Sequence, residues 1–175
     1  EIFIGCDLMS GWIKICGVRD FATAEAIADR EVSAIGLNFF AKSPRSVAPT
    51  QAMEIVERLR SIAATSPQFR DRALRPIPIG LFVNHSLQEI DDIATQVGIS
   101  TIQLHGDESP EFLRELHVRH SDWKLLKAFR ISDSLRPITE FIAECQRLSV
   151  PLAGCLLDAR VDGSFGGTGK VAPWE

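Results

Sequence analysis

The chain has 175 residues, of which 45% are hydrophobic and 24% charged, an ordinary globular composition for a protein with one sizeable core. Its formal net charge of -4 argues against a broad nucleic-acid surface or a polybasic membrane patch. No apolar run approaches the ~20 residues that span a bilayer, and the first residues lack a secretion-signal pattern. We therefore expect neither nucleic acid nor membrane as a partner.

After an N-terminal extension at residues 1–11, residues 12–175 repeat one rhythm and are interpreted as a single barrel domain. A short β-prone run ends in polar or glycine residues, and an amphipathic stretch with helical periodicity follows it. Strands are expected at 12–18, 34–40, 77–84, 101–106, 124–131 and 154–160, and helices at 20–30, 50–64, 86–97, 110–119 and 134–148.

This alternation predicts parallel strands joined by right-handed crossovers, either in an open doubly wound sheet or in a closed barrel. Polar side chains gather at the strand ends. Lys14 and Cys16 point to one side of their strand, Gln103 and His105 point to one side of theirs, and Asp158 lies between two apolar residues. Polar groups at the carboxyl ends of several strands are typical of barrel enzymes. The pattern therefore favours a (β/α) barrel of the TIM type over the open sheet.

The cysteines are Cys6, Cys16, Cys145 and Cys155, and no two of them form a C-x-x-C pair. This spacing fits neither a zinc knuckle nor a dense disulfide framework, so we expect no metal site and a reducing, cytoplasmic location. Each cysteine is by default a small buried hydrophobe. Cys16 is the exception, because it lies at a strand end among other polar residues.

Motifs at the strand ends resemble one enzyme family. They are K-I-C-G-V-R-D from Lys14, G-L-N-F-F-A-K-S-P-R-S from Gly36, G-L-F-V-N from Gly80, Q-L-H-G from Gln103, and L-D-A from Leu157 followed by F-G-G-T-G ending at Gly169. In this order the set closely resembles phosphoribosylanthranilate isomerase over residues 12–174. The resemblance implies a (β/α)8 barrel of tryptophan biosynthesis.

The implied reaction is an Amadori rearrangement. It converts N-(5-phosphoribosyl)anthranilate to 1-(2-carboxyphenylamino)-1-deoxyribulose 5-phosphate. The ring oxygen of the sugar must be protonated, and a proton must leave C2′ of the resulting imine. The reaction needs one acid and one base on opposite sides of the sugar, and neither a metal nor a redox cofactor.

The resemblance also assigns roles to residues of this chain. Cys16 falls on the general base, Asp158 on the general acid, and Arg45 on the residue that holds the anthranilate carboxylate. Lys14, two residues before Cys16 on the same strand face, is either the cation that favours the Cys16 thiolate or a charge at the barrel rim with no role. His105 either positions substrate or is a hydrogen-bonded structural histidine. The phosphate would be held by a glycine-rich loop consisting of Gly166, Gly167, Thr168 and Gly169.

The sequence departs from the family pattern at its end, because six of eight βα units are present and residue 175 falls where a sixth helix would begin. We therefore expect a C-terminally incomplete barrel. An inactive phosphate-ligand-binding or scaffolding relative remains an alternative. A relation to indole-3-glycerol phosphate synthase predicts a Lys/Glu constellation whose motifs the sequence does not show. The pattern leaves open whether the protein is a monomer or a homodimer.

Overall fold

The computed structural model describes residues 2–4, 12–28, 32–65, 76–131 and 134–159. The strands are β1 (Ile2–Ile4), β2 (Lys14–Cys16), β3 (Ala34–Asn38), β4 (Ile77–Phe82), β5 (Thr101–Leu104), β6 (Lys124–Ile131) and β7 (Leu152–Ala159). The helices are α1 (Phe21–Ala28), α2 (Pro49–Thr65), α4 (Leu87–Val97), α5 (Pro110–Arg119) and α6 (Arg136–Arg147).

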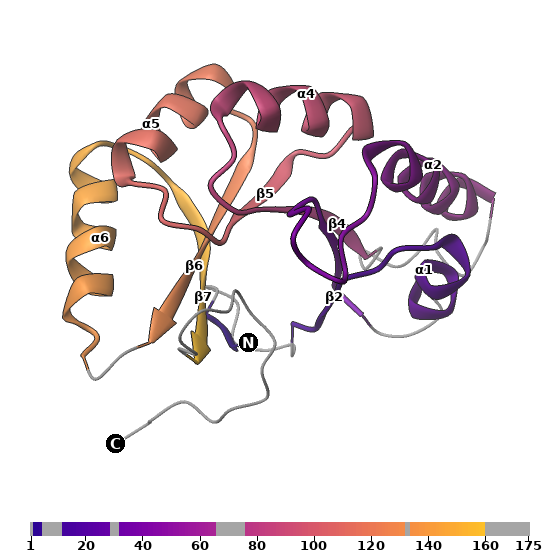
Figure 1. Cartoon of the computed structure of the whole chain (residues 1–175), viewed down its shortest axis with the longest axis horizontal. Coiled ribbons are helices and arrows are strands. Elements are labelled where there is room, and N and C mark those ends of the chain that lie inside the picture. Colours follow the sequence, from indigo (N-terminus) through magenta and orange to yellow (C-terminus); the bar gives the residue numbers. More distant parts are fainter. Residues whose placement is uncertain (1, 5–11, 29–31, 66–75, 132–133, 160–175) are drawn as a thin grey trace.

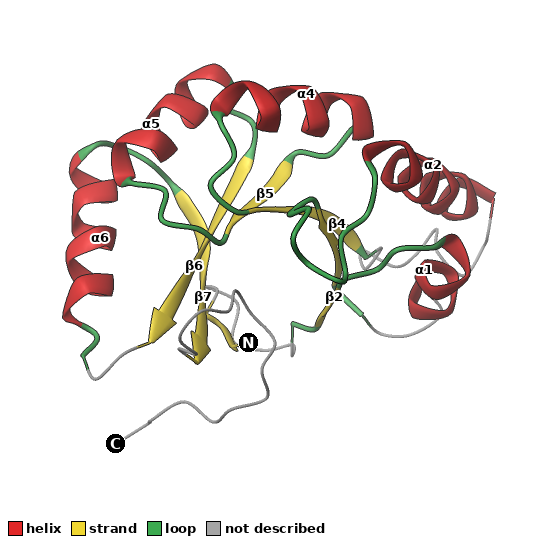
Figure 2. Ribbon diagram, in the orientation of Figure 1, coloured by secondary structure: helices red, strands yellow, loops and turns green. Residues whose placement is uncertain are grey.

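Strands β2 to β7 form one curved sheet in sequential order, and every neighbouring pair among them is parallel. The helices cover the convex side of this sheet in a single layer, as Figures 1 and 2 show. The arrangement is a half-barrel with six of the eight βα units of a TIM-type barrel, which confirms the predicted fold class. Within the ranges given above, no helix is long and apolar enough to cross a membrane.

Strand β1 was not foreseen, since the first residues were interpreted only as an extension. It pairs antiparallel with β7, with Ile2 opposite Leu157 and Ile4 opposite Cys155. The described sheet therefore runs in the order β1-β7-β6-β5-β4-β3-β2. Strand β2 forms the other edge of this sheet, and in the described part of the chain it does not pair with β7 or β1.

Capping residues explain where two of the helices begin. Ser86 accepts a hydrogen bond from the Glu89 N–H, and the Glu89 side chain accepts one from the Ser86 N–H, so α4 starts with a complete capping box. Gly98 ends this helix with φ of 72°, in the left-handed region that glycine adopts readily. Ser109 caps α5, and Pro110 occupies the first turn.

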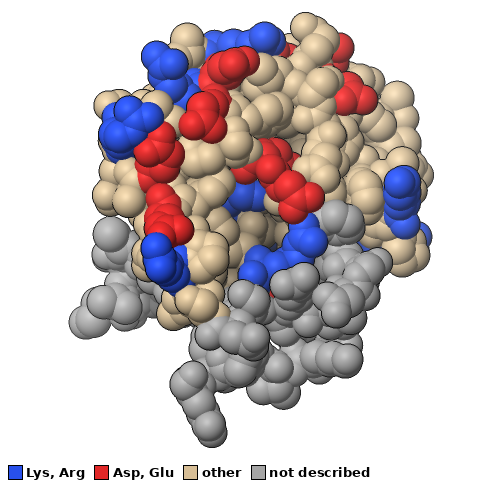
Figure 3. All heavy atoms as spheres, turned by 60° about the vertical axis from the view of Figure 1, so that its left-hand side comes forward, with Lys and Arg blue, Asp and Glu red and all other residues tan. Residues whose placement is uncertain are grey.

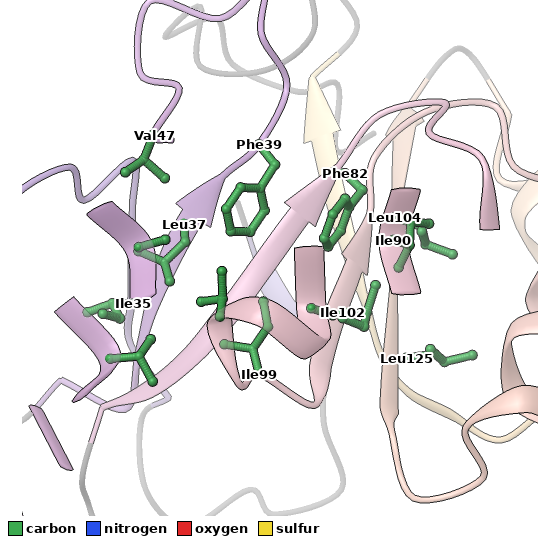
Figure 4. Packing of buried hydrophobic residues seen from close by; sticks show 14 of the residues in the cluster. Ile35, Leu37, Phe39, Val47, Phe82, Ile90, Ile99, Ile102, Leu104 and Leu125 are labelled. Carbon is green, nitrogen blue, oxygen red and sulfur yellow. The ribbon is translucent and has the colours of Figure 1, made fainter. Parts of the chain in front are cut away.

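The larger apolar core lies between the sheet and the helices. Alternate strand residues point outward into it, and Ile90 of α4 packs against them (Figure 4). The rings of Phe39 and Phe82 stack with their centroids 5.2 Å apart. A smaller buried cluster from the sheet alone comprises Ala34, Ile79, Leu126, Ala128 and Leu156.

Strand register determines which residues share the concave face with this smaller cluster. Cys16 is paired with Gly36 and Gly36 with Ile79, while Ala128 is paired with Leu156 and Arg130 with Asp158. Side chains alternate along each strand, so Lys14, Cys16, Gln103 and Asp158 all lie on the concave side. The fold therefore brings together polar residues from strands at both ends of the parallel series.

Candidate active site

A chain of polar contacts crosses the concave face from β2 to β7. The Lys14 Nζ donates a hydrogen bond to Gln103 Oε1 on β5. Gln103 Nε2 lies 3.3 Å from His105 Nδ1, and His105 Nε2 lies 3.6 Å from Asp158 Oδ2. Sequence reasoning predicted Lys14, His105 and Asp158 as site residues, and the structure brings them together through Gln103.

These polar groups are withdrawn from solvent. Gln103 is 0% exposed, and the side chains of His105 and Asp158 are 5% and 14% exposed. Electrostatic and hydrogen-bonding interactions are stronger in such surroundings than in water. Gln103 was not among the predicted site residues, although its position two residues before His105 in Q-L-H-G already placed both on one face.

The Cys16 thiol lies beside Lys14 against a glycine of the neighbouring strand. A methyl group added at Gly36 would lie 2.8 Å from Cys16 Sγ and 3.0 Å from Lys14 Cε. The N–H groups of Gly17 and Val18 both donate to the Gly36 carbonyl, at 2.9 and 3.1 Å, and anchor the end of β2. The absence of a side chain at Gly36 thus leaves room for the thiol and the lysine stem together.

Arg45 lies in the loop between β3 and α2 and is exposed. Its side chain crosses directly over Gly17, where an added methyl group would lie 2.9 Å from Arg45 Cδ. Gly17 itself has φ of 84°, a conformation that L side chains rarely adopt. The predicted carboxylate-binding arginine is therefore placed at the rim, next to the residue that follows Cys16.

A buried ion pair joins the middle of β6 to the segments that follow β4 and β5. Lys127 Nζ lies 2.9 Å from Glu108 Oε2, and the two side chains are 4% and 2% exposed. Lys127 also donates to the Gly106 carbonyl at 2.8 Å, and Glu108 accepts hydrogen bonds from the N–H groups of Asn84 and Gly106. The network immobilises the backbone that follows His105.

Sequence reasoning missed both members of this pair. Lys127 interrupts the apolar residues of the β6 strand, and this position was the only available signal. Charged side chains are almost never fully buried without a partner, so a single lysine between Leu126 and Ala128 gives no local indication of burial. The partner lies 19 residues earlier, in a loop whose conformation the sequence pattern does not specify.

Arg130 is a further residue that sequence reasoning missed. It is the register partner of Asp158, and its Nη2 donates to Asp107 Oδ1 at 2.8 Å. Arg130, Lys127 and Glu108 line a pocket of about 370 Å³ together with Phe129 and Phe141. Figure 3 brings this side of the molecule forward and shows acidic and basic side chains around a hollow in the surface.

Of the other described cysteines, Cys145 is buried, as the default interpretation predicts, and Cys155 is partly buried. Burial, followed by the neighbouring Cys155 thiol, raises the pKa of Cys145 to about 11. Burial also raises the pKa of Cys155. Both groups therefore favour the neutral thiol, whereas a nucleophile or base needs the thiolate. Cys16 is set apart from them by its place on the concave face beside a lysine.

Several predicted features lie outside the described residues. These are the phosphate-loop residues Gly166, Gly167, Thr168 and Gly169 and the cysteine at position 6. In the part of the chain that the structure describes, no group of three or more His, Cys, Asp or Glu side chains is arranged to hold a metal ion.

A family model described as N-(5′-phosphoribosyl)anthranilate isomerase matches residues 13–175. The chain is 36% identical over 165 residues to the N-(5′-phosphoribosyl)anthranilate isomerase of Gloeothece citriformis, covering 93% of this chain and 66% of that one. It is 37% identical over 162 residues to the enzyme of that name from Pseudomonas putida, covering 93% and 68%. The chain thus spans about two thirds of the length of these relatives.

Solved structures agree with this assignment. The phosphoribosyl anthranilate isomerase of Thermotoga maritima matches with a TM-score of 0.71 and 26% identity, over 94% of this chain and 69% of that one. A phosphoribosyl anthranilate isomerase in complex with reduced 1-(o-carboxyphenylamino)-1-deoxyribulose 5-phosphate matches with a TM-score of 0.64 and 26% identity, over 86% and 66%. By its sequence and by its half-barrel, the chain belongs to the N-(5′-phosphoribosyl)anthranilate isomerase family.

Proposed function

We propose that the protein to which this chain belongs is an isomerase of tryptophan biosynthesis. It converts N-(5-phosphoribosyl)anthranilate to 1-(2-carboxyphenylamino)-1-deoxyribulose 5-phosphate. The observation that carries the proposal is the placement of Cys16 on β2 and Asp158 on β7. These strands stand at opposite ends of the parallel series, and both side chains face the concave side. A sugar bound between them would have an acid on one side and a base on the other.

The two residues divide the proton transfers. Asp158 gives a proton to the furanose ring oxygen, so that the bond from C1′ to this oxygen breaks and an imine forms at C1′. Cys16, as the thiolate, removes the proton from C2′, and the resulting enol-amine rearranges to the ketose. No net electrons are exchanged with the protein, and a positioned acid and base are the groups that this reaction requires.

Lys14 supports the base in this scheme. Its side chain and the Cys16 thiol both lie against Gly36 of the neighbouring strand, and Gln103 holds its ammonium group on the same concave face. A cation close to a thiol favours the ionised sulfur. The pairing with Gln103 also keeps the lysine from extending into solvent. His105 lies next to Asp158, the proposed acid, as Lys14 lies next to the base, and it contributes to substrate positioning.

The anionic ends of the substrate need separate partners. Arg45 is proposed to hold the anthranilate carboxylate, because its planar guanidinium matches a carboxylate through two parallel hydrogen bonds. Its position over Gly17 brings this group next to the base. The phosphate is proposed to bind the backbone of Gly166, Gly167, Thr168 and Gly169, where small residues let N–H groups approach the oxygens.

The remaining proposals concern the domain boundaries, the partners, the oligomeric state and the cellular location of the protein. We propose that residues 12–175 belong to one barrel domain and that residues 1–11 extend it. The substrate is a small phosphosugar, and the protein acts without nucleic acid or membrane, as a monomer or homodimer. Cys145 and Cys155 carry free thiols, which suits a reducing cytoplasm. Sizing chromatography coupled to light scattering distinguishes the two assembly states.

The proposal is tested by measuring binding and turnover separately. The purified chain is titrated with reduced 1-(o-carboxyphenylamino)-1-deoxyribulose 5-phosphate, and isomerisation is followed through the fluorescence change of the substrate. Binding together with turnover supports the proposal. Binding without turnover in a folded protein points instead to the inactive phosphate-ligand-binding relative. A folded chain that neither binds nor turns over contradicts both functions.

A further inference from the structure

We propose that Gln103 is a positioning residue that holds His105 in one tautomer, with the ring proton on Nε2 and directed at Asp158. The consequence for catalysis rests on the proposed function, whereas the tautomer itself is a property of the folded chain. The proposal adds a residue that has no direct role in the proton transfers. It follows from the hydrogen-bonding capacities of three neighbouring side chains.

The first step is the orientation of the Gln103 amide. A lysine ammonium group can donate hydrogen bonds but cannot accept them. Because Lys14 Nζ is bonded to the amide of Gln103, the atom that faces it must be the carbonyl oxygen. The amide nitrogen is thereby turned toward His105 and lies 3.3 Å from Nδ1. The contact with Lys14 thus determines which end of the Gln103 amide is the oxygen and which is the nitrogen, an assignment that is otherwise ambiguous for glutamine.

The second step is the tautomer of His105. The amide NH₂ group can only donate, so Nδ1 must be the unprotonated ring nitrogen that accepts. In a neutral imidazole the proton is then carried by Nε2. His105 Nε2 is buried and, among the described residues, has no hydrogen-bond partner. The carboxylate oxygen that faces it is Asp158 Oδ2, at 3.6 Å.

The third step is the effect on Asp158. A distance of 3.6 Å is too long for a good hydrogen bond, but catalytic hydrogen bonds are often long before ligand binds and shorten in the complex. An N–H group aimed at Oδ2 requires this oxygen to act as an acceptor. The acidic proton of Asp158 must therefore reside on the other oxygen. Gln103 thus selects, through His105, the oxygen from which the proton is delivered.

Burial argues that Gln103 does more than fill space. It is 0% exposed on the face that also carries Leu126, and an apolar side chain of similar size would occupy the same volume. Burying an amide is unfavourable unless its polar atoms are hydrogen-bonded. Gln103 uses its oxygen toward Lys14 and its nitrogen toward His105, so both ends of the amide have defined partners.

Nuclear magnetic resonance of the histidine side chains tests the tautomer directly. The 175-residue chain is labelled with ¹⁵N, and the two ring nitrogens of His105 are observed through their couplings to the ring protons at about pH 8, where a free imidazole is neutral. His105→Asn identifies the signals. The expected spectrum shows a protonated Nε2 and an unprotonated Nδ1. A proton on Nδ1 in the wild-type chain overturns the proposal.

Gln103→Glu provides the decisive comparison, because it keeps the shape but presents two acceptor oxygens. One carboxylate oxygen still pairs with Lys14, and the other now requires a donor from His105. The Nδ1 signal should therefore shift to the protonated position. The matched control is Gln51→Glu, the same chemical change at an exposed residue of α2, which should leave the His105 signals unchanged. An unprotonated Nδ1 in folded Gln103→Glu contradicts the proposal.

If the buried carboxylate prevents folding, Gln103→Met replaces it. This variant has no amide to donate to Nδ1, so the His105 signals should change from one tautomer to a mixture. Retention of the single wild-type tautomer would show that another group determines it. Neither spectrum depends on turnover, so failure of the isomerase proposal is recognised separately from failure of this one.

In an active preparation, a double-mutant cycle relates Gln103 to the acid. Gln103→Met should lower kcat by about tenfold or more, within the contribution of a positioned acid, and change KM little. In the Asp158→Asn background the same change should have almost no further effect. An equal fall in both backgrounds would mean that Gln103 does not act through Asp158.

Discussion

Arg45 and Lys42 lie in one loop and carry the same charge, yet only Arg45 crosses Gly17 beside Cys16. Arg45→Ala is expected to weaken binding of the reduced product analogue by about ten- to a hundredfold. That corresponds to the ~1.5–3 kcal/mol of hydrogen bonds to a charged group. Isothermal titration calorimetry measures the loss. Lys42→Ala, a matched control that removes an exposed cation from the same loop, should bind almost normally.

If both variants lose affinity equally, the loop acts only through its overall charge. An analogue that lacks the carboxylate gives a second check. It should bind wild type and Arg45→Ala with similar affinity, since the group that Arg45 is proposed to hold is absent. A large difference for this analogue would contradict the assignment of Arg45.

The raised pKa of Cys145 predicts that the stability of the fold decreases at alkaline pH. The folded chain holds the thiol proton up to about pH 11, whereas the ordinary thiol ionises near 9.0. The neutral thiol therefore contributes stability that is fully present below pH 9 and is lost as the pH rises toward 11. Between about pH 8 and about pH 10.5, the free energy of unfolding measured with urea should fall less in Cys145→Ala than in wild type. The same loss in both proteins would contradict this origin.

The proposed site residues differ in how far the sequence alone could identify them. Cys16, Asp158 and Arg45 were predicted because they lie in motifs that resemble those of the family, Cys16 and Asp158 at strand ends and Arg45 in the loop after β3. Gln103 and Arg130 were not, because their roles depend on neighbours from other strands. Lys14 orients the Gln103 amide across 89 residues of sequence, and no local pattern records that contact.

The secondary-structure elements were mostly predictable because helical and strand periodicity are local properties. Their order, type and parallel pairing are as expected, with ends that differ by a few residues, such as a β7 that begins at Leu152. Strand β1 was missed for a physical reason. Three residues carry no usable periodicity, and the strand exists through backbone pairing with β7, more than 150 residues away.

The pair formed by Lys127 and Glu108 links β6 to the segments that follow β4 and β5, and its removal should lower the stability of these elements. Lys127→Met leaves the Glu108 carboxylate buried without its cation and should cost ~3–5 kcal/mol in the free energy of unfolding. Chemical denaturation measures this change. Arg147→Met, at the exposed pair with Glu144, is the matched control and should change stability by no more than ~0.5 kcal/mol.

Adding Glu108→Gln to Lys127→Met should restore much of the loss. The glutamine carbonyl can still accept hydrogen bonds from Asn84 and Gly106, but it carries no charge that needs neutralising. If Lys127→Met lowers the free energy of unfolding no more than Arg147→Met does, the buried pair does not stabilise this part of the sheet.

The concave face of the whole half-barrel, not any single element, brings the proposed acid and base into one site. Cys16 is on the edge strand β2, and Asp158 is on β7, with four parallel strands between them. The sheet must curve for their side chains to face a common ligand. The sequence predicted this curvature only indirectly, from the family resemblance and from polar residues at several strand ends, because curvature depends on packing along the entire sheet.

The proposed isomerase activity is tested most directly by comparing turnover of N-(5-phosphoribosyl)anthranilate by wild type, Cys16→Ala and Asp158→Asn. We expect wild type to form product, and each variant to lose at least about a hundredfold in kcat, the scale of a positioned acid or base. Both variants should still bind the reduced product analogue with nearly wild-type affinity. Near-normal turnover by either variant, or loss of binding with turnover retained at saturation, would contradict the assignment of Cys16 and Asp158 as the proton-transfer pair.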